Sequence, residues 1–315
     1  MSNDLIKLLE LYPSEQWNWN SLSKNPNILF SYIKSHPELP WKHHSMSYNP
    51  SITIDIIKEH SEINWNYSIL SKHPNITLDM VRANPDISWD HTYLSMNPNI
   101  TIDIVKANKD IHWDYELLTL NPNITIDIVK ANKEYKWSNF FLSSNRNSTI
   151  EVAKAHPDIK WQIYNICNNV NTTWDMVKNN PDVPWDYTHL SQNPNITMEI
   201  VNSNSNLPWN YIKLIQNPNI TWDIVTGDSR FKKFHRDFST NPNLTFEIVR
   251  DNPQVKWNFK GISRNTFENT NKRHAIDIIN KCCKQYLKNK RFNTMNSMEE
   301  FDALPDEVKM LITEF

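Results

Sequence analysis

The chain has 315 residues, of which 39% are hydrophobic and 22% are charged, and its formal net charge is −2. This composition is typical of a folded protein and excludes an intrinsically disordered chain, and the small net charge gives no sign of nucleic-acid or membrane binding. Cys167, Cys282 and Cys283 are too few for a disulfide framework. Since neither a signal-peptide pattern nor a membrane-length apolar run is visible, we expect a cytoplasmic protein.

The first predicted element is an N-terminal capping helix within residues 1–16. From there a tryptophan returns at a constant 24-residue interval and fills ten of eleven successive positions, with Lys233 in the remaining one: Trp17, Trp41, Trp65, Trp89, Trp113, Trp137, Trp161, Trp185, Trp209 and Trp257. A fixed period of this length identifies a tandem repeat array, in which neighbouring repeats share one continuous core. We therefore interpret these Trp as the spine of the core; the alternative is an exposed stacking surface.

Each repeat has the pattern of two short helices. In residues 97–120, Thr101 is a natural N-cap for a first helix, and Asp114 is one for a second helix that is partly 3-10 in character. The second helix ends before Pro122, because the residue that precedes a proline avoids helical angles. Isolated helices of this length are marginal in water, so the repeats must stack. The sequence predicts an all-α solenoid of ten to eleven repeats over residues 17–271.

The repeat resembles two groups of known proteins. Its period and its pattern Leu-Ser-x-Asn-Pro-Asn-Ile-Thr are similar to those of the leucine-rich variant repeats over residues 17–265, although the Trp position is not part of that family's pattern. The resemblance implies α-helices that alternate with 3-10 helices in a right-handed superhelix. The motif Asn-Pro-Asn-Ile-Thr, as at residues 97–101, also resembles repeat proteins of giant viruses of the mimivirus type. That resemblance implies an infected-cell or virion setting and carries no known activity.

The residue after the cap Thr is a first candidate for an interaction surface. It is large and apolar throughout the array and becomes more aromatic towards the end: Ile150, Trp174, Met198, Trp222 and Phe246. On a helix it lies about 200° from the apolar residue two positions later, so both cannot face the same cleft. We expect the helix to be buried on two sides. The alternative is a concave groove whose exposed apolar stripe binds a partner.

The interrupted repeat around the missing Trp is a second candidate. In the simpler interpretation, Phe231 or Phe234 fills the volume of the absent indole. The alternative is a basic patch for an acidic partner, formed by the following residues: Arg230, Lys232, Lys233, His235 and Arg236.

The chain ends in two further predicted segments. Residues 272–292 have the pattern of a basic amphipathic helix, which we expect to cap the last repeat; contact with nucleic acid or membrane is the alternative. The tail, residues 293–315, contains a Leu-Pro-x-Glu sequence that resembles the opening of an F-box, the Skp1-binding module of ubiquitin-ligase adaptors. Truncated F-boxes also end repeat proteins of poxviruses. The resemblance implies that host Skp1 is contacted by Leu304, Pro305, Glu307, Val308 and Ile312.

The sequence contains no catalytic constellation. Two Gly in the chain leave no material for a phosphate-binding loop, and the eleven His have no metal-ligand spacing. We therefore expect no enzyme activity, no metal and no cofactor. The function predicted is a non-enzymatic scaffold that binds one or more proteins along an extended solenoid surface. The alternatives are a viral adaptor that recruits host Skp1 through the tail, and a structural component of a virion.

Overall fold

The structure is a computed structural model that describes residues 3–167 and 169–267. All elements of the described residues are helices, and they lie in one compact unit, Met1–Thr266. No helix among them is long and apolar enough to span a lipid bilayer. The predicted cap at residues 272–292 and the tail at residues 293–315, with its F-box-like residues, lie outside the described residues.

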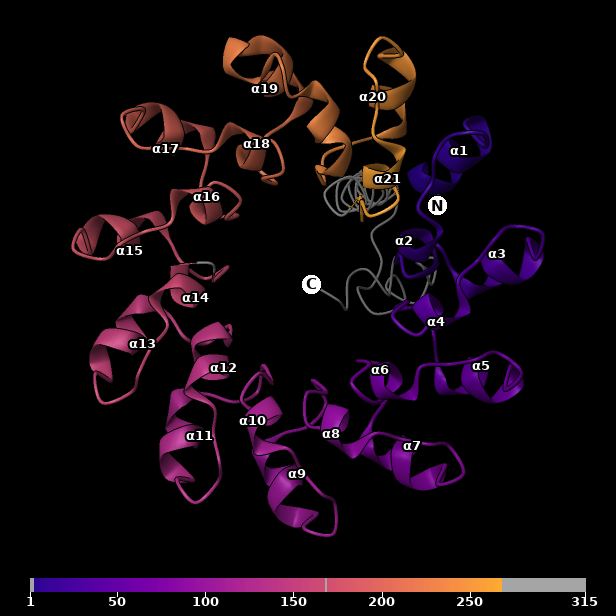
Figure 1. Ribbon diagram of the computed structural model, residues 1–315, viewed down its shortest axis with the longest axis vertical. Coiled ribbons are helices and arrows are strands. Elements are labelled where there is room, and N and C mark those ends of the chain that lie inside the picture. Colours follow the sequence, from indigo (N-terminus) through magenta and orange to yellow (C-terminus); the bar gives the residue numbers. More distant parts are fainter. Residues whose placement is uncertain (1–2, 168, 268–315) are drawn as a thin grey trace, which may run out of the picture. The chain divides into compact units, whose positions relative to one another are not determined.

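Two concentric sets of helices make up this unit (Figure 1). The outer helices are α1 (Asp4–Leu11), α3 (Phe30–Ser35), α5 (Ile54–Glu59), α7 (Leu78–Ala83), α9 (Ile102–Ala107), α11 (Ile126–Ala131), α13 (Ile150–Ala155), α15 (Trp174–Asn179), α17 (Met198–Ser203), α19 (Trp222–Gly227) and α20 (Phe246–Asp251). The inner helices are α2 (Trp19–Ser23), α4 (His43–Met46), α6 (Tyr67–Ser71), α8 (His91–Leu94), α10 (Tyr115–Leu118), α12 (Asn139–Ser144), α14 (Ile163–Cys167), α16 (Tyr187–Leu190), α18 (Tyr211–Leu214), the 3-10 helix η2 (His235–Thr240) and α21 (Phe259–Ile262). The all-α repeat solenoid that the sequence predicts is confirmed.

The helices begin where the cap residues are. Thr101 Oγ1 accepts a hydrogen bond from Ile104 N at 3.4 Å at the start of α9, and Asp114 Oδ1 accepts one from Leu117 N at 2.9 Å at the start of α10. Such bonds satisfy amide groups that have no partner within the helix. The repeat of residues 97–120 shows which apolar positions face the core: Ile100, Val105, Ile111, Trp113 and Leu118 are all buried.

The repeating Trp belongs to the core and also carries a hydrogen bond. None of the ten Trp is exposed, and each indole Nε1 donates to the carbonyl oxygen five residues earlier at 2.8–3.1 Å. That carbonyl belongs to the C-cap residue of the outer helix, such as Asn108 at the end of α9. The indole therefore stabilises a helix end as well as filling volume.

A buried asparagine joins each repeat to the one before it. The side-chain amide of Asn121 donates to three backbone carbonyl oxygens of the preceding repeat at 2.8–3.2 Å: Ser95, Asn97 and Ile100. The same position is buried in every repeat, and its residues form what we call the asparagine ladder: Asn25, Asn49, Asn97, Asn121, Asn145, Asn169, Asn193, Asn217, Asn241 and Asn265. His73 takes the remaining position, where its Nε2 lies 3.1 Å from the Asn49 carbonyl oxygen.

The ladder continues from the last repeat to the first, so the array closes into a ring. The Asn25 amide donates to the carbonyl oxygens of Ser263 and Asn265 at 3.0 and 2.9 Å, and Asn18 N donates to Ser263 Oγ at 2.9 Å. Asn25 and Asn265 are 240 residues apart, which is 24 residues short of eleven 24-residue repeats. Counted across the junction, their bond therefore spans the same 24-residue step as the other ladder bonds. The junction therefore has the register of every other repeat boundary.

The closed ring differs from the open right-handed superhelix that the family resemblance implies. Helix α1, from the segment expected to cap the array, packs against α20, the outer helix of the last repeat. Phe246 N donates to Asp4 Oδ2 at 3.1 Å, and Lys7 Nζ lies 5.2 Å from the centre of the Phe246 ring. Leu9 of α1 falls in the register of Ile33 and is buried in the same way. Helix α1 therefore takes the position of an outer helix in the first repeat and covers the last repeat.

Because the ring is closed, we expect a ladder residue at the junction to contribute about as much to the free energy of unfolding as a ladder residue far from the junction. We expect Asn121→Ala to lower the free energy of unfolding by about 2–4 kcal/mol, because buried carbonyl groups lose their donor. Asn25→Ala should cost a similar amount. Urea unfolding followed by Trp fluorescence measures both changes.

The control is Asn139→Ala, since Asn139 is exposed on α12 and its replacement should change stability by less than about 0.5 kcal/mol. In an open array the Asn25 amide would face solvent. A loss for Asn25→Ala no larger than that of the control would therefore contradict the ring.

The ladder histidine predicts a pH dependence of stability. Burial lowers the pKa of His73 below its ordinary value, about 6.5 in an unfolded chain. The folded state therefore binds fewer protons, and the stability contributed by the neutral ring is lost as the pH falls through and below about 6.5. We expect His73→Asn to reduce the drop in unfolding free energy between about pH 7.5 and 5.5.

The matched control for this measurement is His112→Asn, because His112 is exposed. It should leave the pH dependence as it is in the parent protein. A His73→Asn variant whose stability falls with acid as steeply as that of the parent would show that His73 is not the group responsible.

Candidate functional site

The apolar stripe packs between repeats, and four of its five residues keep part of their surface exposed. Ile150 is buried in a cluster with Ala153 and Ile166, and the other four stripe residues are partly buried. The ring centre of Trp174 lies 5.8 Å from that of Trp209, and the ring centre of Trp222 lies 5.4 Å from that of Trp257. Each stripe Trp thus contacts the spine Trp of the next repeat. Burial between repeats therefore describes Ile150, whereas Trp174, Met198, Trp222 and Phe246 stay partly exposed.

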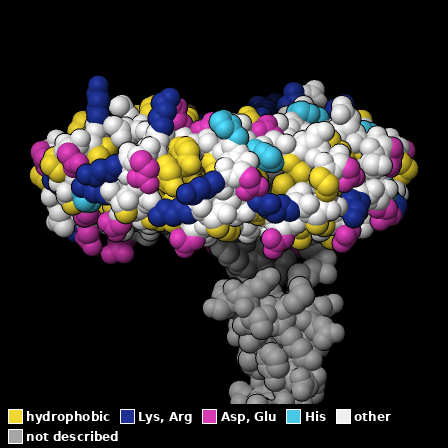
Figure 2. Space-filling model, turned by 90° about the horizontal axis from the view of Figure 1, so that it is seen from below, with side chains coloured by type: hydrophobic (Ala, Val, Ile, Leu, Met, Phe, Trp, Pro, Cys, Tyr) yellow, Lys and Arg dark blue, Asp and Glu magenta, His cyan; other side chains and the backbone are white. Residues whose placement is uncertain are grey.

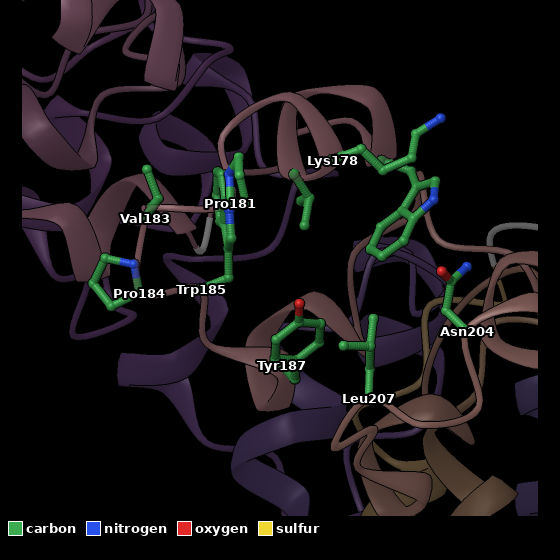
Figure 3. A pocket seen from close by; sticks show the side chains of 10 residues that line it. Lys178, Pro181, Val183, Pro184, Trp185, Tyr187, Asn204 and Leu207 are labelled. Carbon is green, nitrogen blue, oxygen red and sulfur yellow. The ribbon is translucent and has the colours of Figure 1, made fainter.

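The partial exposure of Trp174 opens a pocket at the boundary between two repeats. The pocket has a volume of about 480 Å³ and is lined by Trp174, Val177, Lys178, Pro181, Val183, Pro184, Trp185, Tyr187, Asn204 and Leu207. Figure 3 shows Pro181 and Trp185 on one side and Asn204 on the opposite side, with Tyr187 and Leu207 below. Burial raises the pKa of the Tyr187 phenol. The lining is mainly apolar and aromatic, and we call this the aromatic pocket.

A second pocket lies two repeats further along the chain, at the same position of the repeat. It has a volume of about 420 Å³ and is lined by Trp222, Thr226, Lys232, Lys233, His235, Arg236, Asn252, Gln254, Val255 and Lys256. Trp222, Asn252 and Val255 occupy the repeat positions that Trp174, Asn204 and Leu207 have in the aromatic pocket. Lys233 replaces the spine Trp185. We call this second site the basic pocket.

The interrupted repeat makes this replacement possible because Phe231 takes over the packing of the absent indole. A short 3-10 helix, η1 (Ser229–Phe231), follows α19, and Phe231 is fully buried. Its ring centre lies 5.5 Å from that of Tyr211 at an interplanar angle of 71°. In the preceding repeat, Trp209 meets Tyr187 edge-on in the same way, at 5.3 Å. Lys233 is thereby released from the core and is exposed at the pocket.

Of the five residues predicted for a basic patch, the structure brings four together and uses the fifth otherwise. Lys232, Lys233, His235 and Arg236 line the basic pocket. Arg230 does not line it: its Nε lies 2.9 Å from both Asp228 carboxylate oxygens, and its Nη2 donates to Asn202 Oδ1 at 2.6 Å.

The ion pair between Arg230 and Asp228 shifts both pKa values, since each charge favours the other. Hydrogen bonding to Arg230 lowers the pKa of Asp228, and hydrogen bonding to Asp228 raises that of Arg230. The Arg230 guanidinium also contacts Tyr211, so it links the interrupted repeat to the one before it. Arg230 therefore stabilises the interrupted repeat and is not part of the basic pocket.

Sequence reasoning missed Lys256, which belongs to the next repeat and completes the basic pocket. The signal for it was present, because Lys232 and Lys256 both directly precede a spine position, at Lys233 and Trp257, and so occupy the same position of successive repeats. Successive repeats lie side by side in a solenoid. A basic patch at one repeat therefore extends to the equivalent position of its neighbour.

The cations of the basic pocket differ from many others on the ring in having no acidic partner. Within the described residues, Lys232, Lys233, Arg236 and Lys256 form no ion pair, and no acidic side chain lines the pocket. Figure 2 shows the ring edge-on, with basic and acidic side chains interspersed along the visible part of its outer wall. Rim pairs such as Arg82 with Asp110, at 3.0 Å, neutralise each other.

Neither pocket has the groups of a metal centre. Among the described residues, no three or more His, Cys, Asp or Glu side chains are grouped so that they could hold a metal ion. The aromatic pocket offers apolar surface with one Lys, and the basic pocket offers positive charge beside an indole. In protein interfaces in general, aromatic side chains give contact area and charges give specificity.

The packing of the interrupted repeat predicts unequal roles for its two Phe residues. We expect Phe231→Ala to lower the free energy of unfolding by about 3–5 kcal/mol, because it leaves a cavity beside Tyr211. Phe234→Ala should cost clearly less, since Phe234 is only partly buried. Urea unfolding of the two variants compares them directly, and equal losses would contradict the assignment of Phe231 to the place of the indole.

No protein family model, no curated protein sequence and no solved structure matches the chain. The function of the two pockets must therefore be inferred from their geometry and charge.

Proposed function

We propose that the ring is a non-enzymatic scaffold that binds another protein across the repeats of α15 to α20. The observation that carries the proposal is the pair of equivalent pockets, which lie two repeats apart at the only two positions where the stripe residue is Trp. Met198 is the stripe residue of the repeat between them. Partly exposed Trp and Met side chains along successive repeats suit a protein partner.

The chemistry of the aromatic pocket supports a protein ligand. Trp174, Trp185 and Tyr187 present rigid rings around a space that a large apolar side chain can enter. Lys178, the one cation in the lining, is paired with Asp175 at 2.8 Å. A partner that buries an apolar residue here therefore meets little competing charge.

The closed ring adds rigidity to this surface. Both pockets are built from adjacent repeats, and the ladder residues Asn193, Asn217 and Asn241 fix those repeats to one another. A surface that is already ordered loses little conformational entropy when a partner binds, which favours affinity. The Skp1-binding tail and the virion setting stay predictions from the sequence.

The proposal is tested by quantitative affinity capture with the full chain as bait. Pro181→Glu with Pro184→Glu places two charges on exposed residues of the aromatic pocket. Pro37→Glu with Pro40→Glu makes the same change at the equivalent positions six repeats earlier, where the stripe residue is the buried Phe30. We expect proteins bound by the parent to be lost, by about tenfold or more, from the first variant only.

Circular dichroism and urea unfolding show whether both variants fold as the parent does. If the parent and the Pro181→Glu with Pro184→Glu variant capture the same proteins, the aromatic pocket does not bind them. If the folded parent enriches no protein from any lysate of its host, the scaffold function itself fails.

A further inference from the structure

We infer that the basic pocket binds an acidic segment of the partner protein, one that carries an apolar residue next to its carboxylates. The inference rests on the proposed function and names the chemistry of the partner. It depends on three properties of the pocket: its charge, its indole surface and its confinement to a single repeat boundary.

The charge comes from four side chains that no acidic residue of the pocket neutralises. Lys232, Lys233, Arg236 and Lys256 enter its lining from two successive repeats. The carboxylates of Asp228 and Asp251 do not line the pocket and pair with Arg230 and Arg250, at 2.9 and 2.7 Å. Unpaired cations that converge on one hollow favour an anion and steer its approach.

The indole of Trp222 gives the pocket its apolar component. Its ring centre lies 5.2 Å from that of Phe238 and 5.4 Å from that of Trp257, so the indole is held by the core on one side. Trp222 and Val255 also line the pocket. A ligand that is only anionic would leave this apolar surface uncovered, whereas an apolar residue beside the acidic groups would bury it.

The limited extent of the positive charge argues against a nucleic-acid strand. A strand places phosphates along several repeats, and proteins that bind one track it with cations over that length. At the aromatic pocket, Pro184, Trp185 and Tyr187 stand where the basic pocket has Lys232, Lys233 and His235. A short acidic segment needs only the one basic pocket.

The probe for this inference is a fluorescent peptide of alternating Glu and Leu residues, with a Gln and Leu peptide of equal length as its neutral counterpart. Fluorescence anisotropy with the full chain measures both affinities at low and moderate salt. We expect the Glu peptide to bind more tightly, and its affinity to fall as salt screens the charges.

The chain offers a pair of variants at equivalent repeat positions, of which the control includes Lys136, whose Nζ lies 2.6 Å from Glu116 Oε1. Lys232→Glu with Lys256→Glu reverses two cations of the basic pocket. Lys136→Glu with Lys160→Glu makes the same change at the same position of two other successive repeats. All four side chains are exposed, so both variants should fold. The first should weaken binding of the Glu peptide by about tenfold or more, because attraction becomes repulsion, and the second should change it little.

Each contrary result has one meaning. Equal weakening by both variants would show general attraction to a cationic surface and would overturn the inference. A labelled single-stranded oligonucleotide that binds more tightly than the Glu peptide, and that Lys232→Glu with Lys256→Glu releases, would assign the pocket to nucleic acid instead. If the parent binds no Glu peptide but loses its captured partners through Pro181→Glu with Pro184→Glu, the acidic ligand fails while the scaffold function stands.

Discussion

The side-chain amide of the ladder asparagine is the interaction on which the rest of the ring depends. Helices of four to eight residues, as in α10 and α1, cannot persist alone in water, so each repeat needs its neighbour. Apolar burial draws repeats together without direction, whereas hydrogen bonds from Asn121 to three carbonyl oxygens fix how far and at what angle they approach. The turns after the inner helices thereby bury their backbone carbonyls without a β-sheet.

Much of the repeat could be predicted because its determinants are local. Thr101 and Asp114 cap helices through bonds that span three residues, and the constant Trp period indicates which side of each repeat faces the core. The ladder was harder to foresee, since a recurrent Asn before Pro also has the pattern of a simple turn. Asn is mostly exposed in proteins, and only its burial against the preceding repeat shows what its amide does.

Ring closure and the pockets could not be read from the sequence because they depend on accumulated geometry. A small rotation at each boundary decides whether eleven repeats return to their start, and no single residue encodes that rotation. Lys233 shows the same limit on a smaller scale. Its neighbours indicated a break in the repeat, but only the packing of Phe231 on Tyr211 shows that the core stays filled while the lysine faces a pocket shared with Lys256.

The contact between α1 and α20 has a consequence for how such a protein can evolve. Open arrays lengthen or shorten by duplication or loss of whole repeats, since a new unit only shifts the end. Here Asn25 must meet Asn265 in register, so a gained or lost repeat would change the curvature required at every boundary at once. The ring therefore selects against changes in repeat number, and new binding properties must arise by substitution within the existing repeats, such as the one that has Lys233 at the tryptophan position.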